Sequence, residues 1–150
     1  MTQQKKKSLQ SCLLFIFSAS LFASLIGIFW LYKTITSEVK NNYGDPNSSM
    51  DLYKTILYSG KLYFSNGSLL KNQNDLNENL FFEILPGESV GQISYRLRMN
   101  NLIKDSELFT DYLIYKGYDK KVQSGFFRIE PGMNGIEIAE KITSPIPDKV

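Results

Sequence analysis

The sequence predicts an α+β fold, in which a single transmembrane helix precedes a small module ordered strand, helix, helix, strand, helix. Three observations support this fold class. An uncharged apolar run lies near the N-terminus. One pattern occurs twice in the second half, as "FEILPGESVGQISYRL" from Phe82 and "FRIEPGMNGIEIAEKI" from Phe127. Between these copies, apolar residues at helical spacing predict the remaining helix.

The composition excludes several function classes. The 150 residues allow one or two small domains. The net charge of +2 is too small to indicate a nucleic-acid partner. The chain has no histidine, which excludes a histidine base, a histidine metal ligand and a Ser-His triad. Its single cysteine, Cys12, can form no intrachain disulfide. We therefore expect no cofactor and no metal.

The apolar run at residues 13–32, "LLFIFSASLFASLIGIFWLY", predicts a membrane anchor. A helix of about 20 uncharged residues spans the hydrocarbon core of a bilayer. Lysines at positions 5–7 precede the run, and the positive-inside rule then keeps the N-terminus in the cytoplasm. We expect residues 1–12 to be a cytoplasmic basic tail and residues 13–32 to cross the inner membrane of a bacterial cell.

A cleaved signal peptide is the alternative interpretation of this run, because "SASLFAS" contains small residues. The run continues past these residues and ends in bulky aromatic side chains, including Trp30 and Tyr32. This ending favours an uncleaved anchor, with its aromatic residues at the outer membrane interface.

Residues 33–79 are expected to form an extracytoplasmic linker with one helix. Residues 34–49 are polar and contain the turn signal "YGDPNSS". Residues 51–64 predict an amphipathic helix. Its apolar residues are Leu52, Ile56, Leu57, Tyr63 and Phe64. Residues 66–79, "NGSLLKNQNDLNEN", are rich in asparagine, and we expect a spacer that is too polar to pack.

Residues 80–143 are expected to form the folded module. Residues 80–85 and 126–130 predict two strands, each closed by a Pro-Gly turn. Ser89, Asp105 and Asn134 are placed to cap the three helices. Two strands alone are marginal, so we expect them to pair and the helices to cover one face. The expected core residues are Phe82, Ile84, Val90, Ile93, Leu97, Leu108, Phe109, Tyr112, Leu113, Phe127, Ile129, Ile138, Ala139 and Ile142.

The order strand, Pro-Gly, capped helix, "NNLI", helix resembles a LysM domain. The wider stretch, residues 81–142, resembles the LysM-like region of the endolytic murein transglycosylase family (MltG or YceG-like). In that family one N-terminal transmembrane helix precedes this region, as it does here. The matching pieces are residues 86–89, 101–103, 123–126 and 131–133.

This resemblance implies a peptidoglycan-associated protein that acts in glycan-strand processing and cell wall organisation. The glycan would lie in a shallow groove between the loop after the first strand and the loop before the second. The resemblance places residues 87–89 against residues 100–103 or the neighbouring Tyr118 region. The expected glycan-binding residues are Gly87, Glu88, Ser89, Asn100, Asn101, Leu102 and Ile103. The alternative is that the loop glycines and prolines only make turns while the tyrosines fill the core.

The partners that the resemblance implies are peptidoglycan glycan strands, the inner membrane and proteins of cell-wall synthesis. In the family, a catalytic domain with a glutamate as general acid and base follows this region, and nothing in this chain aligns with it. We expect residues 144–150 to be a truncated linker to that absent domain.

The residues themselves also argue against catalysis. Glu88 lies at a predicted helix start, where the helix dipole favours the ionised form over the neutral acid that glycoside cleavage needs. Glu137 and Glu140 are expected on a solvated helix face. We therefore predict no catalytic residue and no lytic activity of this chain alone.

Two functional hypotheses remain. The chain is the anchor and LysM-like portion of a lytic transglycosylase, or it is a stand-alone, non-catalytic module at the membrane. In the second case it binds peptidoglycan or a protein of the cell-wall machinery.

Overall fold

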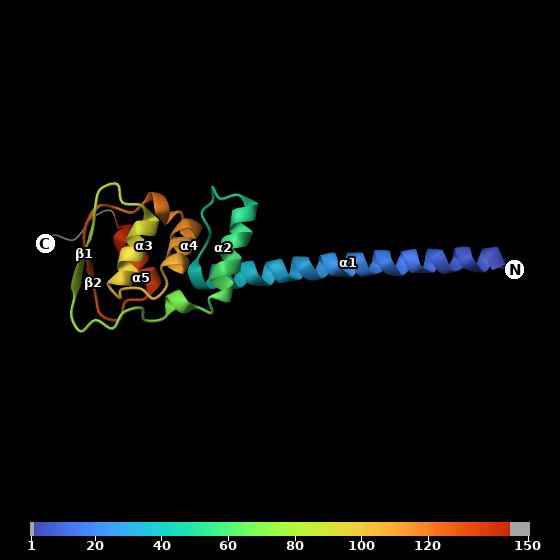
Figure 1. Cartoon of the computed structure of the whole chain (residues 1–150), viewed down its shortest axis with the longest axis horizontal. Helices are drawn as coiled ribbons and strands as arrows, with labels where there is room; N and C mark the ends of the chain where they lie inside the picture. Colours follow the sequence, from blue (N-terminus) through green and yellow to red (C-terminus); the bar gives the residue numbers. More distant parts are fainter. Residues whose placement is uncertain (1, 145–150) are drawn as a thin grey trace. The chain divides into compact units, whose positions relative to one another are not determined.

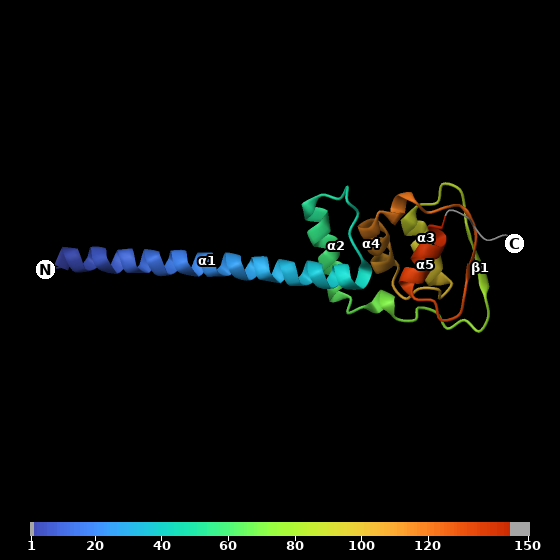
Figure 2. The same cartoon turned by 180° about the vertical axis from the view of Figure 1, so that it is seen from behind.

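The computed structural model describes residues 2–144, with side chains from Cys12 onward. The chain divides into two compact units, Met1–Ile35 and Thr36–Val150. The fold class is α+β, as predicted, with a long N-terminal helix followed by helices and a two-stranded sheet (Figures 1 and 2). The elements are α1 (Thr2–Tyr43), α2 (Leu52–Phe64), η1 (Ser68–Leu70), β1 (Leu80–Ile84), α3 (Val90–Met99), α4 (Ser106–Lys116), η2 (Tyr118–Lys120), β2 (Gly125–Ile129) and α5 (Gly135–Ile142).

Helix α1 contains the predicted apolar run. Its segment Cys12–Tyr43 is long and apolar enough to cross a membrane, with a mean hydropathy of 2.4 over its most apolar window. The large apolar side chains between Leu13 and Leu31 are exposed. The prediction of a long apolar N-terminal helix is confirmed. Because a membrane anchor and a signal sequence both have these features, the uncleaved anchor stays a prediction.

The helix continues beyond the end that the sequence predicted. We expected a polar linker from residue 34, but helical structure extends to Tyr43. The last turns of α1, from Thr36 on, belong to the second unit. Val39 and Tyr43 are buried there, four residues apart on one helix face. Packing of this face explains why a polar stretch stays helical.

The two predicted strands pair as expected. β1 and β2 are antiparallel, with Phe82 opposite Phe127 and Leu80 opposite Ile129. Because side chains alternate between the faces of a strand, every second residue points into the core. Phe82, Ile84, Phe127 and Ile129 are all buried, which confirms the predicted inward face.

Helices α3, α4 and α5 supply the rest of this core, and their caps match the prediction. The Ser89 side chain accepts a hydrogen bond from the Gln92 N–H, and the Asn134 side chain accepts from the Glu137 N–H. Both helices carry a complete capping box. Asp105 caps α4. Val90, predicted in the core, is only partly buried. The other predicted core residues of these helices are buried: Ile93, Leu97, Leu108, Phe109, Tyr112, Leu113, Ile138, Ala139 and Ile142.

Residues 66–79 correct the expectation of a segment too polar to pack. Leu69 is fully buried, and Gln73 and Asn74 are each 2% exposed. The Gln73 side chain donates to the carbonyl oxygens of Ser68 and Lys71 and accepts from the Lys104 N–H. Amide side chains can be buried when their donors and acceptors are paired within the protein, as they are here.

The remaining domain boundaries stay predictions. The division between a linker ending at residue 79 and a module starting at residue 80 still requires a test of independent folding. Of the expected linker at residues 144–150, residues 145–150 lie outside the described part of the chain.

Candidate functional site

Two loops lie side by side at one end of the sheet. Ile84, the last residue of β1, pairs with Gly125, the first residue of β2. The loop after β1, residues 85–89, and the loop before β2, residues 117–124, therefore leave the sheet at the same end (Figures 1 and 2). We call these two loops together the two-loop face.

The structure separates the two groups of predicted glycan-binding residues. Residues 87–89 lie in the first loop of the two-loop face, and residues 100–103 follow the far end of α3. The ten residues of α3 place its two ends about 15 Å apart. The loop of residues 117–124, which contains Tyr118, leaves the sheet at the same end as residues 87–89.

The first Pro-Gly turn is open to solvent. The Glu88 N–H donates to the Leu85 carbonyl oxygen over 3.2 Å, which closes a β-turn. Gly87 has a φ of +81°, as the third residue of a type II turn requires. A Cβ atom added at Gly87 would meet no other atom within 4 Å. A ligand can therefore approach this backbone closely.

Glu88 holds the first turn in place and is not presented to a ligand. Its two carboxylate oxygens each lie 2.7 Å from Nη1 of Arg96, and one also accepts the Leu85 N–H over 3.1 Å. Arg96 donates in addition to the Glu83 carbonyl oxygen, and its guanidinium stacks 4.9 Å above the centre of the Phe82 ring. The Glu88 side chain is 9% exposed as a result.

Arg96 was not predicted as the partner of Glu88. Arg96 lies about two helical turns into α3, a spacing that places it on the same helix face as the first residues of that helix. This spacing could have indicated the pair, but it would not have shown that Glu83 and Phe82 also contact the guanidinium.

The other predicted residues have structural roles. The Ser89 hydroxyl and backbone N–H both donate to Oε1 of Gln92 in the capping box. Asn100 donates from its side chain to the Arg96 carbonyl oxygen, and Asn101 has a left-handed φ of +56°. Leu102 and Ile103 are buried in the core. A ligand at residues 102 and 103 could reach only their backbone.

The second Pro-Gly turn, residues 130–133, is hydrogen-bonded to Asn74. The Gly132 N–H donates to Oδ1 of Asn74 over 3.2 Å. Nδ2 of Asn74 donates in turn to the carbonyl oxygens of Glu130 and Met133. The Gln73 N–H also donates to the Met133 carbonyl oxygen. The backbone groups that are open in the first turn are therefore occupied in the second.

The second loop of the two-loop face is built around Tyr118. Its ring lies edge-on to the Tyr112 ring, with centroids 6.2 Å apart, and the Lys121 ammonium lies 5.6 Å from its centre. Burial raises the pKa of Tyr118, and the charge of Glu140 adds to this shift. Tyr118 therefore stays neutral at physiological pH. The Gln123 N–H donates to the Ile142 carbonyl oxygen and ties the loop to the end of α5.

The two-loop face can hold a polar ligand. Its exposed residues include two apolar ones, Leu85 and Pro86, and three donors, Lys120, Lys121 and Gln123. Glu88 is already engaged by Arg96. Within the described residues, no group of three or more His, Cys, Asp and Glu side chains could hold a metal ion. The arrangement suits binding, whereas bond cleavage needs a free carboxyl in a sheltered cleft.

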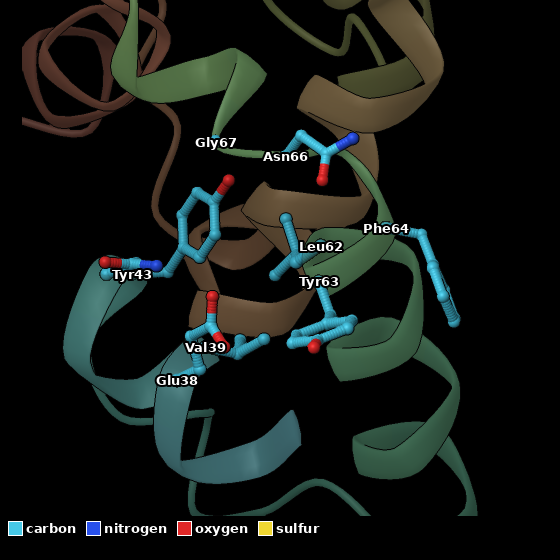
Figure 3. A pocket seen from close by; sticks show the side chains of 9 residues that line it. Glu38, Val39, Tyr43, Leu62, Tyr63, Phe64, Asn66 and Gly67 are labelled. Atoms are coloured by element: carbon cyan, nitrogen blue, oxygen red, sulfur yellow. The ribbon is translucent and has the colours of Figure 1, made fainter. Parts of the chain in front are cut away.

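The structure also has clefts that the sequence did not predict. One of about 360 Å³ lies between the last turns of α1 and the end of α2 (Figure 3). Tyr43 lines it, and its hydroxyl lies 3.2 Å from the Ser65 hydroxyl. Burial raises the pKa of Tyr43, and the hydrogen bond to Ser65 opposes this shift.

A second cleft, of about 400 Å³, lies beside Lys61 on α2. Nζ of Lys61 lies 2.8 Å from Asp111 and 3.5 Å from Glu107. The hydrogen bond to Asp111 raises the pKa of Lys61, which stays charged. Neither cleft lies at the two-loop face.

Two known proteins are similar to this chain. Over 115 residues it is 28% identical to the uncharacterised protein YqzC of Bacillus subtilis (strain 168), a match that covers 74% of this chain and 75% of YqzC. Over 89 residues, 59% of this chain, it is 29% identical to the endolytic murein transglycosylase of the same organism. That match spans 24% of the transglycosylase. No protein-family model and no solved structure matches the chain.

Proposed function

We propose that this chain is a membrane-anchored module that binds peptidoglycan glycan strands at its two-loop face without cleaving them. The N-terminus lies in the cytoplasm, the apolar part of α1 crosses the inner membrane once, and the LysM-like module lies outside. The observation that carries the proposal is the open first turn. The Gly87 backbone is accessible, whereas the N–H of the matching Gly132 donates to the Asn74 side chain.

The chemistry of the two-loop face fits a glycan of this class. Peptidoglycan strands carry N-acetyl groups and hydroxyls, which pair with backbone groups and amides such as Gln123. They also carry carboxylates, which Lys120 and Lys121 complement. Leu85 and Pro86 give an apolar surface for the faces of the sugar rings. The partial match to a murein transglycosylase supports murein as the glycan.

The role of such a module is local concentration. Tethering to the membrane converts a weak glycan contact into an effectively intramolecular one. In the transglycosylase setting, the module holds strands near a catalytic domain and near the membrane where new strands emerge. The engagement of the Glu88 carboxylate by Arg96 supports a binding role over a lytic one.

A second function is favoured by the match to YqzC. The similarity to that protein extends over 75% of its length, whereas it covers 24% of the transglycosylase. A protein of comparable extent is thus similar to most of this chain. Under this second proposal the module works without a catalytic domain of its own and binds peptidoglycan or a protein of cell-wall synthesis.

The test is to incubate the purified full chain, in detergent micelles, with isolated peptidoglycan sacculi. We expect saturable co-sedimentation that soluble glycan fragments compete away, and no release of anhydro-muropeptides. Absence of co-sedimentation would contradict glycan binding. Release of anhydro-muropeptides that is lost in Glu88→Gln would contradict the non-catalytic role.

Membrane topology requires a separate test. Protease added to intact spheroplasts should remove the C-terminal module and leave the N-terminal tail. Recovery of the whole chain in the soluble fraction after cell disruption would contradict anchoring.

A further inference from the structure

Helix α2 carries an apolar stripe that faces away from the core. The stripe consists of Tyr53, Ile56, Leu57, Gly60 and Phe64, which follow the spacing of one helix face. Tyr53 is 74% exposed and Phe64 is 75% exposed. The buried residues of α2, Ser59 and Leu62, lie on the opposite side. We predicted an amphipathic helix here, but most of its apolar residues lie outside the core.

We propose that this stripe lies in the interface of the lipid bilayer that holds the apolar part of α1. The inference rests on the membrane anchoring proposed above. It adds a second membrane contact, made by the folded unit itself. Amphipathic helices with aromatic and aliphatic side chains on one face bind in the plane of a membrane in this way.

A short tether joins the proposed anchor to the part of the chain that contains α2. Residues 33–43 of α1 are helical and span about 16 Å beyond Tyr32. The Tyr43 hydroxyl contacts Ser65, the residue that follows α2, over 3.2 Å. Because only residues 33–43 separate the apolar run from Tyr43, the length of the chain limits how far α2 can move from a bilayer that holds residues 13–32. Such a tether gives a high effective concentration, so a small apolar surface is enough.

The second argument is the size of the stripe, which disfavours a protein partner. The 13 residues of α2 extend about 20 Å, and a stripe about 10 Å wide covers about 200 Å². Stable protein interfaces bury about 800 Å² on each partner. The stripe alone is thus too small to hold a second copy of the chain.

The third argument is the charge around the stripe. The sequence of α2 contains no acidic residue and two lysines, Lys54 and Lys61. Lys54 lies 3.7 Å from Asp51 and Lys61 lies 2.8 Å from Asp111. Both lysines are therefore neutralised within the chain. An uncharged stripe suits the apolar interface itself, and its contact should not depend on anionic lipid.

The experiment labels single cysteines in the full chain. In a Cys12→Ser background, Leu57→Cys marks the stripe, where Leu57 is 41% exposed, and Tyr95→Cys marks a site on α3 that is 56% exposed. Each variant receives an environment-sensitive fluorophore and is reconstituted in phosphatidylcholine vesicles with or without a lipid-borne quencher. Vesicle flotation reports anchoring independently of the fluorophore.

We expect both variants to float and only the Leu57→Cys probe to be blue-shifted and quenched by the labelled lipid. Flotation with equal, unquenched emission at both sites would overturn this inference and leave anchoring intact. A blue shift without lipid quenching would assign the stripe to a second copy and also overturn it. Failure to float would overturn the anchoring proposal and this inference together.

Gly60 provides a graded control, because a side chain there extends the stripe. A Cβ at Gly60 would meet no atom within 4 Å, so substitution should leave the fold intact. We expect Gly60→Leu to raise the ratio of docked to undocked α2 about tenfold, and Gly60→Glu to lower it by a similar factor. Quenching that requires anionic lipid would contradict an apolar contact. Quenching that is the same in the parent and in both Gly60 variants would contradict it as well.

Discussion

The two strand–turn–helix copies have the same backbone conformation but differ in which side chains hold their turns. Gly87 and Gly132 have φ values of +81° and +82°, and a capping box starts the helix after each. The first turn is held from within its own copy, by Glu88 and Arg96. The second is held by Asn74, which comes from outside both copies.

This difference separates the folding role of the repeated pattern from its binding role. Both copies need the strand, the type II turn and the capped helix to build one core. Only the second copy has its turn glycine N–H hydrogen-bonded to a side chain from outside the copies, Asn74. A ligand contact should therefore belong to the first copy, although the sequence pattern is the same in both.

The largest expected effect is one that the two copies share. Phe82 and Phe127 are directly paired on the two antiparallel strands, and both are buried. Truncating either to alanine should lower the free energy of unfolding by about 3–5 kcal/mol, because a buried ring is replaced by a cavity. Denaturant unfolding of the full chain in detergent measures both. A Phe127→Ala variant that unfolds like the parent would show that the copies do not share one core.

The next effect should differ between the copies. Asn74→Ala leaves the Gly132 N–H and the Glu130 and Met133 carbonyl oxygens without this partner, at a cost of about 2–3 kcal/mol. Arg96→Met removes a partly exposed ion pair at the first turn and should cost about 1 kcal/mol. The same unfolding assay compares them. A larger loss of stability for Arg96→Met than for Asn74→Ala would show that the first turn is held more firmly than the second.

The third prediction tests the shared backbone geometry. Gly87→Ala and Gly132→Ala each place a Cβ on a residue with a left-handed φ, which should cost about 1 kcal/mol in both cases. Neither Cβ meets an atom closer than 3.9 Å, so backbone strain is the common term. Thermal unfolding of the two variants should agree. A clear difference would mean that the turns are not equivalent.

The smallest effect concerns Tyr115, a residue that belongs to neither copy. The Tyr115 hydroxyl donates to the Gly44 carbonyl oxygen over 3.0 Å, and burial raises the pKa of Tyr115 to about 12. In an unfolded chain the pKa of tyrosine is about 10. As pH rises from 10 to 12, the unfolded state loses this proton before the folded state does, so stability is lost.

Tyr115→Phe should cost about 1 kcal/mol at neutral pH and make the alkaline loss of stability less steep. Unfolding midpoints between pH 7 and pH 12 measure both effects. An unchanged alkaline slope would show that Tyr115 is not one of the groups that titrate.

The elements that depend on local pattern could be predicted from the sequence. Alternating aromatic and aliphatic residues gave both strands and their inward faces, and Ser89, Asp105 and Asn134 gave the helix starts. The equal phase of Phe82 and Phe127 within the two copies predicted that both would face one core. Each of these inferences uses residues that are neighbours in the sequence.

The features that depend on distant partners could not be predicted in this way. Asn74 covers a turn that lies far along the chain, and nothing in an asparagine-rich stretch indicates which asparagine is buried. The apolar residues of α2 give its helical period but not the direction of its apolar face. The pairing of residues 100–103 with the first turn followed from a resemblance, and the length of α3 excludes close proximity.

The most direct test of the account compares Gly87→Asn with Gly132→Asn in binding to isolated sacculi. Asparagine tolerates the left-handed conformation better than most residues, so both full-length variants should fold. A side chain at Gly87 projects into the space that the proposed glycan would occupy, whereas one at Gly132 lies at the turn held by Asn74. We predict that Gly87→Asn weakens co-sedimentation about tenfold or more and that Gly132→Asn binds like the parent. Equal binding of the two variants, whether retained or lost, would contradict the assignment of the glycan site to the first copy.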